Sequence, residues 1–231
     1  TLSNVRGGLD GSSGSGPVIR SGPRSDSSSD SETNATARRS TTVDTVTTYM
    51  DDAPKVRQRA DDRAIEISQA GGDVALGDAP HGAVIHTGGG DIRVGAASGV
   101  VDARTGGGRI EVGPVAGSVR ASTGAGKVVV TLVDPAGAEQ DVEIFTGSGD
   151  VEVRLPASLD ARFEIETAYT RRDAPTHIDS TWELDHQPVT GWESHEGTPR
   201  RYVRALGSAG NGRGLIRIKA VNGNVTLRRG R

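Results

Sequence analysis

Apolar and polar residues alternate in short, similar stretches through the middle of the chain. Each stretch opens with a glycine and a charged residue. Three residues follow, of which the first and the third are apolar and the middle one varies. The apolar pairs are Val74 and Leu76, Ile92 and Val94, Ile110 and Val112, Val128 and Val130, and Val151 and Val153. Because successive side chains of a strand point to opposite faces, these pairs predict short strands with one face in the core and the other mostly in water.

A second strand phrase, which ends in threonine, follows each of the first ones. These phrases occupy residues 83–87, 101–105, 119–123, 142–146 and 163–167. The repeat is regular, since Asp73, Asp91, Arg109 and Lys127 follow one another at intervals of 18 residues. Lys127 and Asp150 are 23 residues apart, which predicts a loop inserted into one repeat. A short fixed period is typical of a stacked repeat protein.

Two strands in each 18-residue repeat could form a β-solenoid or the hairpins of an antiparallel sandwich or barrel. In a solenoid, equivalent positions of successive coils lie about 4.8 Å apart, so they favour residues that stack. The sequence contains a threonine column (Thr87, Thr105, Thr123, Thr146, Thr167) and a glycine column (Gly72, Gly90, Gly108, Gly126, Gly149). We expect the glycines at corners with positive φ and the threonines at strand ends, sharing hydrogen bonds along their column. We therefore predict an all-β, single-domain parallel β-solenoid with coils of ~18 residues, and keep the sandwich as the alternative.

Composition divides the chain into segments. Residues 1–40 are rich in serine and glycine and nearly free of apolar residues after Ile19, so we expect a disordered linker there. Residues 41–54 are expected to form a cap or a first strand, and residues 55–231 the solenoid. The closing phrase matches the Phe163 and Val151 columns through Ile216, Ile218, Val225 and Leu227. We expect it to be the terminal coil, and its positive charge either guards an open sheet edge or belongs to an ordinary solvated tail.

The repeat is interrupted between residues 168 and 214. This segment contains both tryptophans, two tyrosines and three histidines: Tyr169, Trp182, Trp192, Tyr202, His177, His186 and His195. The four aromatic residues either cover the solenoid as a lid or form a ligand surface, because aromatic side chains dominate both cores and recognition sites. The histidines are nine residues apart, which matches no tight metal-ligand spacing, so we expect no metal site.

Neither composition nor motifs predict catalytic residues or a cofactor. The absence of cysteine rules out disulfides, thiolate catalysis and zinc–cysteine sites. Lys127 is followed by Val128 where a phosphate loop needs serine or threonine, and Glu111 stands where the dinucleotide fingerprint needs glycine. The outward rows of the predicted strands mix charges and small residues and do not bring two acids together, as a glycosidase requires.

The charged residues at the glycine corners form a column of mixed sign. It contains Asp73, Asp91, Arg109, Lys127 and Asp150. A column of calcium ligands, as in glycine-rich nonapeptide repeats, would not tolerate the two cations. We interpret the column as neighbouring opposite charges on a solvated corner.

The net charge is −3 with a pI near 6.0, so we expect no nucleic acid partner. No apolar stretch approaches the ~18 residues that cross a bilayer, and we expect no transmembrane segment in this chain. The sequence begins at Thr1 and shows no signal peptide, which leaves export open at this point.

Three phrases resemble a family of bacterial adhesin-like β-strand repeat domains. They are Thr146-Gly-Ser-Gly-Asp-Val-Glu-Val-Arg-Leu-Pro156, the earlier Thr87-Gly-Gly-Gly-Asp-Ile-Arg-Val94 and the closing Ile216-Arg-Ile-Lys-Ala-Val-Asn-Gly-Asn-Val-Thr-Leu227. The resemblance covers residues 55–229. It implies a β-repeat fold and a place in the cell envelope or outside the cell, and it implies no catalytic residues.

We accordingly expect a non-catalytic, adhesin-like binding or scaffold module of the cell envelope, with a surface glycan or protein as its partner and a monomeric state. Its ligand surface would consist of Tyr169, Trp182, Trp192 and Tyr202. The alternative is an intracellular β-helix of the bactofilin kind that polymerises through its stackable coils. A carbohydrate-active β-helix enzyme is the third possibility.

Overall fold

The computed structural model describes residues 41–43, 46–49, 55–57, 64–135, 138–194 and 197–230, the first three ranges by their backbone alone. The linker predicted for residues 1–40, and His195, lie outside the described residues. The described strands belong to one compact unit of the chain. They are all β, and none of the described residues forms a helix long and apolar enough to cross a membrane.

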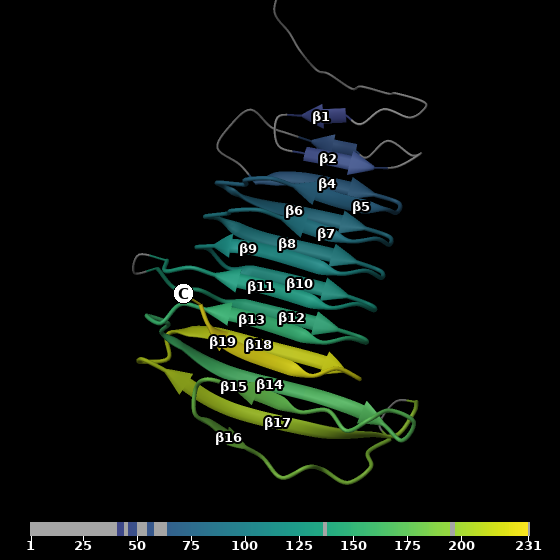
Figure 1. Ribbon diagram of the computed structural model, residues 1–231, viewed down its shortest axis with the longest axis vertical. Coiled ribbons are helices and arrows are strands. Elements are labelled where there is room, and N and C mark those ends of the chain that lie inside the picture. Colours follow the sequence, from purple (N-terminus) through teal and green to yellow (C-terminus); the bar gives the residue numbers. More distant parts are fainter. Residues whose placement is uncertain are drawn as a thin grey trace, which may run out of the picture. The chain divides into compact units, whose positions relative to one another are not determined.

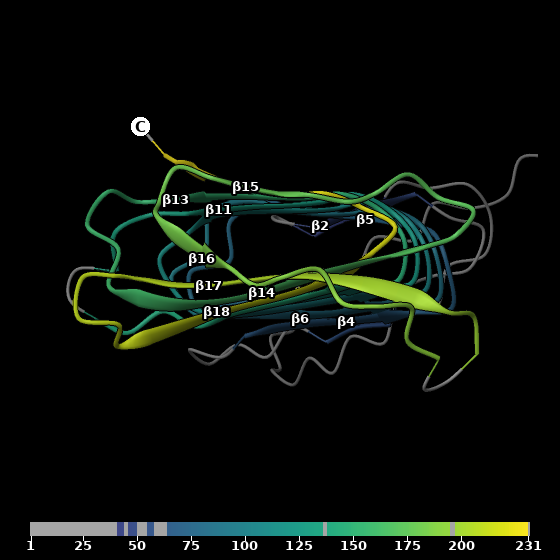
Figure 2. The same ribbon diagram turned by 90° about the horizontal axis from the view of Figure 1, so that it is seen from below.

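The strands form two sheets that face each other across one apolar core (Figure 1 and Figure 2). In spatial order the first sheet contains β1 (Thr41–Val43), β2 (Val46–Tyr49), β5 (Asp73–Leu76), β7 (Ile92–Val94), β9 (Ile110–Val115), β11 (Val128–Leu132), β13 (Val151–Leu155), β19 (Val225–Arg229) and β15 (Ile178–Ser180). The second contains β16 (Leu184–His186), β17 (Arg200–Ala209), β14 (Ala161–Thr170), β18 (Gly214–Val221), β12 (Val142–Thr146), β10 (Val119–Thr123), β8 (Val100–Thr105), β6 (Gly82–Thr87), β4 (Ile65–Gln69) and β3 (Lys55–Arg57).

Neighbouring coils pair in parallel and in register, which confirms the β-solenoid and not the antiparallel sandwich. In the second sheet, Thr123 of β10 pairs with Thr105 of β8 on one side and with Thr146 of β12 on the other. The register is kept although β11 ends at Leu132 and β12 begins only at Val142, so the described residues between them, 133–135 and 138–141, lie outside the strands, where the inserted loop was predicted.

The inward and outward assignment of the strands is also confirmed. Ile110 and Val128 are fully buried, and Arg93 and Glu111 of the same sheet are exposed. The core is filled by valine, isoleucine, leucine and alanine, and Phe163 is the largest fully buried side chain among the described residues. Medium aliphatic residues suit a narrow core that is closed by stacking rather than by large rings.

The glycine column forms corners at which a side chain has no room. Gly108 has φ +129°, and a Cβ atom at this position would lie 2.2 Å from the carbonyl oxygen of Gly90 in the neighbouring coil. The prediction of positive φ is confirmed here and at Gly149, with φ +135°. Successive coils therefore approach each other so closely at this corner that only glycine fits.

The threonine column is buried, but its hydroxyls do not bond to one another. Thr123 Oγ1 donates to the carbonyl of Gly108 in the neighbouring coil and to that of Ala125 in its own, both at 3.0 Å. Thr87 and Thr105 make the equivalent pairs of bonds. The threonine hydroxyls thus bind the backbone carbonyls of the glycine corners from the core side. This corrects the expectation of hydrogen bonds along the column.

The charged corner column also works differently from the predicted ladder of opposite charges. Asp73 Oδ1 accepts a hydrogen bond from the backbone N–H of Asp91 at 2.7 Å, and Asp91 Oδ1 accepts one from that of Arg109 at 2.8 Å. Asp150 does the same for Asn224. The aspartate side chains accept hydrogen bonds from backbone N–H groups of the next coil, because a corner leaves these N–H groups without a partner in the strand ladder.

The closing phrase is not the terminal coil. The strands β18 and β19 lie between β12–β13 and β14–β15, as the yellow strands in Figure 1 show. Ile216 pairs with Val142 on one side and with Phe163 on the other, so its column is the predicted one. The order of the coils differs because every coil presents the same residues to both neighbours, and sequence similarity alone cannot order them.

Both ends of the stack carry antiparallel strands. At one end β2 pairs with β5 and β3 with β4, and at the other end β17 pairs with β14 and β16 with β17, all antiparallel. The four outermost described strands, β1, β3, β15 and β16, have three residues each. Such short edges offer little backbone for pairing with a second molecule.

Candidate functional site

The outward faces of the solenoid are covered with charges that pair with each other. Arg104 lies 2.8 Å from Asp102, and Lys127 lies 2.9 Å from Glu152. Further outward pairs are Arg93–Glu111, Arg120–Glu143, Arg154–Glu152 and Arg217–Glu164. Hydrogen bonding by Lys127 lowers the pKa of Glu152, and Asp102 raises the pKa of Arg104 by the same means. These pairs leave little charge on the faces for a ligand.

The end of the stack formed by β14, β15, β16, β17 and their loops is different, and we call residues 161–209 the cap. Its frame is the antiparallel pair of β14 and β17, in which all ten residues of each strand are in register. Near the end of this ladder, Ala168 pairs with Tyr202 and Tyr169 pairs with Arg201. A long two-stranded ladder fixes the side chains at its end relative to each other.

Four side chains gather at that end of the ladder, and we call Tyr169, Arg171, Trp192 and Arg201 the Trp192 cluster. The rings of Trp192 and Tyr169 form a T-shaped contact, with centroids 6.0 Å apart and planes at 76°. The guanidinium carbon of Arg171 lies 5.0 Å from the Trp192 ring centroid and that of Arg201 lies 4.9 Å from it. Tyr169 is buried, Trp192 and Arg201 are half-buried, and Arg171 is exposed.

Tyr202 belongs to the same ladder but to its other face. It is the neighbour of Arg201 on β17, so its side chain points away from the Trp192 cluster. Arg204 lies 5.0 Å from the Tyr202 ring centroid and forms an ion pair with Glu166, which raises the pKa of Arg204 through their hydrogen bond. The charge of Arg204 is therefore neutralised.

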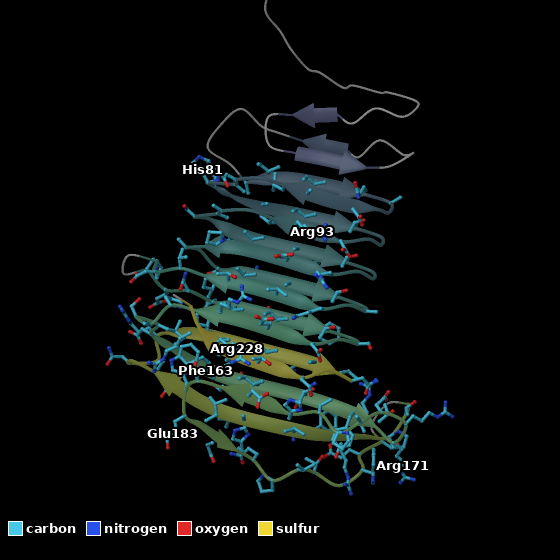
Figure 3. The ribbon with its side chains drawn as sticks, in the orientation of Figure 1. His81, Arg93, Phe163, Arg171, Glu183 and Arg228 are labelled. Carbon is cyan, nitrogen blue, oxygen red and sulfur yellow. The ribbon has the colours of Figure 1, made fainter. Side chains whose placement is uncertain are left out.

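Trp182 lies at the opposite end of the cap. Its ring centroid is 5.7 Å from that of buried Phe163, and Arg229 lies 5.5 Å from its ring. Phe163 and Tyr169 are six residues apart on β14, which separates the surroundings of the two tryptophans by roughly 20 Å. Figure 3 shows Phe163 and Arg171 at opposite ends of this strand pair. Trp182 packs against the core together with half-buried Leu184, as a lid does.

The structure thus separates the four residues predicted for a ligand surface. Tyr169 and Trp192 lie together, Tyr202 lies on the other face, and Trp182 closes the core. The arginines around Trp192 were not part of the prediction. Their signal in the sequence is two double arginines inside the interrupted segment, Arg171-Arg172 and Arg200-Arg201.

The two described histidines of the interrupted segment, His177 and His186, lie at different sheets. His177 Nε2 lies 3.3 Å from Asp179 on the first sheet, and His186 lies on β16 at the edge of the second. No group of three or more potential metal-ligating side chains occurs among the described residues.

Comparisons of this chain with protein-family models, with curated proteins and with solved structures find no match. The resemblance to adhesin-like repeat domains is therefore carried by the repeat phrases alone.

Proposed function

We propose that this protein is a non-catalytic binding module of the cell envelope or cell surface, in which the solenoid is a rigid spacer and the cap carries the ligand surface. The ligand we propose is a surface glycan. The observation that carries this proposal is the Trp192 cluster, where a half-buried tryptophan and two arginines lie together at the end of a fixed strand ladder. Tryptophan, tyrosine and arginine are the residues that contribute most to recognition surfaces.

The contrast with the solenoid faces supports this location. Arginines on the faces are paired with carboxylates, Arg104 with Asp102 of the same strand and Arg217 with Glu164 of the neighbouring strand. The pKa values shifted among the described groups belong to such ion pairs, as at Glu152 and Arg213, and not to acids brought together in a cleft. A paired, repetitive surface suits a spacer, and ligand binding is expected where the repeat ends.

The alternative of a polymerising β-helix receives less support. A filament built by stacking coil on coil needs long open edges at both ends. Here the outermost described strands have three residues each, and the long strand β14 is already paired on both sides by β17 and β18.

The proposal is tested with the 231-residue chain on an array of neutral and acidic glycans. We expect binding to at least one class of glycan and a loss of roughly tenfold or more in the Trp192→Ala variant. Phe145→Ala is the matched control, because Phe145 is 47% exposed but lies on β12, within the solenoid face. Binding that survives in Trp192→Ala, or a parent chain that binds no glycan, would contradict the proposal.

A further inference from the structure

The half-buried rings of the cap are covered by guanidinium groups. Arg171 and Arg201 lie over the ring of Trp192, Arg204 lies over Tyr202, and Arg229 lies over Trp182. The distances between guanidinium carbon and ring centroid are 4.9 to 5.5 Å. Neutral sugars bind to proteins largely by placing their C–H groups on an open aromatic face. A ring that already holds a guanidinium has less of its surface open to such stacking. The cap therefore presents cations supported by rings rather than bare rings.

The cations of the Trp192 cluster differ from Arg204 in having no carboxylate partner among the described residues. Arg204 is paired with Glu166, whereas Arg171 and Arg201 form no ion pair within the described part of the chain. The same holds for Arg172 and Arg200 beside them. In addition, the Nε atom of Arg201 is buried without a hydrogen-bond partner. Buried donors of this kind are normally satisfied, so the cluster lacks an acceptor.

We propose that the Trp192 cluster binds the carboxylate of an acidic sugar, with Arg171 and Arg201 as the donors and Trp192 as the support that holds both guanidiniums. This inference rests on the proposed binding function and names its ligand class. The planar guanidinium fork matches a carboxylate with two parallel hydrogen bonds. Stacking on a ring restricts the guanidinium in advance, which lowers the entropy lost on binding.

A short acidic saccharide fits this surface better than a membrane or a nucleic acid. The whole chain carries a net charge of −3, and Asp173 and Glu193 lie in the chain close to Arg172 and Trp192. Their charges would repel a membrane surface or a nucleic acid that covers the whole end of the cap. A short acidic saccharide can place one carboxylate at the two arginines without covering the whole end of the cap.

The test is isothermal titration of the full chain with hexagalacturonate and with its fully methyl-esterified counterpart, which has the same sugar backbone without charge. We expect binding of the acid that weakens with added salt, and at least tenfold weaker binding of the ester. Arg171→Gln and Arg201→Gln should each weaken binding of the acid roughly tenfold. Arg109→Gln is the control, because Arg109 is an exposed arginine in a solenoid corner, and it should bind as the parent does.

Equal binding of acid and ester, unchanged binding in both cluster variants, or no binding of the acid would overturn the inference. Circular dichroism of each variant separates loss of binding from loss of folding. Vesicles of phosphatidylglycerol serve as a second probe, and stronger binding to them than to the hexamer would favour a lipid surface and overturn the sugar carboxylate. A neutral glycan bound through Trp192 on the array would leave the proposed function standing while this inference fails.

Discussion

The corners of this solenoid depend on hydrogen bonds from threonine side chains and on glycines that leave room for the neighbouring coil. The column threonines donate to corner carbonyls, as Thr123 does to Gly108 and Ala125. The sequence predicted which residues stack and that Gly108 has positive φ, because both follow from the period. It did not predict the partners of the threonine hydroxyls, because a column of equal residues does not show whether they bond to each other or to the backbone beside them.

The hydroxyl of Thr123 can be tested by removing it without changing its shape. Thr123→Val should lower the free energy of unfolding by about 1–3 kcal/mol, because the carbonyl of Gly108 loses its buried donor. Ser122→Ala, on the same strand and with its side chain on the other face, should change it by less than about 0.5 kcal/mol. Urea denaturation measures both, and equal effects would show that the buried hydroxyl has no special role.

The two adjacent glycines Gly107 and Gly108 form a sharper pair. A Cβ on Gly108 would lie 2.2 Å from a backbone oxygen, whereas a Cβ on Gly107 would have its nearest neighbour at 4.0 Å. Gly108→Ala should therefore lower the free energy of unfolding by at least about 3 kcal/mol, through strain in φ and displacement of the neighbouring coil. Gly107→Ala should be close to neutral in thermal denaturation. A similar loss at both positions would speak against a corner built for glycine at Gly108.

At the scale of the elements, the order of the coils is the feature that periodicity could not predict. The matches of Ile216 and Ile218 identified the correct column, and the expectation that they end the stack was wrong. A strand that can pair on both sides fits equally well inside the stack and at its end. The cap decides between these places, since β17 runs antiparallel along the outer edge of β14 and leaves the inner edge for β18.

The position of β18 between β12 and β14 predicts which of two engineered disulfides can form. Phe145 of β12 and Lys219 of β18 are direct partners, so their Cα atoms are about 4.8 Å apart, within the range for a disulfide. Glu166 of β14 is one strand further away, at about 9.6 Å from Phe145. Because the chain has no cysteine, a double variant has only the two introduced thiols.

Phe145→Cys with Lys219→Cys should therefore lose both free thiols on mild oxidation, and Phe145→Cys with Glu166→Cys should keep them as a monomer. Thiol titration with mass spectrometry distinguishes the two. The reverse result would place β14 directly beside β12 and return the closing phrase to the end of the stack.

At the scale of the whole molecule, a repetitive scaffold is joined to one non-repetitive end. The solenoid repeats its inward residues from coil to coil, and its outward charges are paired locally. The aromatic residues of the cap were found from the sequence because they break the repeat. Their division into a lid around Trp182 and a cluster around Trp192 depends on where each falls along β14 and β17, which composition does not show.

The central claim is that the cap carries an open, positively charged surface at Trp192, and quenching of tryptophan fluorescence tests it without a known ligand. In the Trp182→Phe variant, Trp192 is the only tryptophan of the chain. At low ionic strength, iodide should quench its emission several times more strongly than caesium, because two guanidiniums attract the anion to the ring. Hexagalacturonate should protect the ring from iodide. Equal quenching by both ions, or stronger quenching by caesium, would contradict a cationic binding surface at this end of the protein.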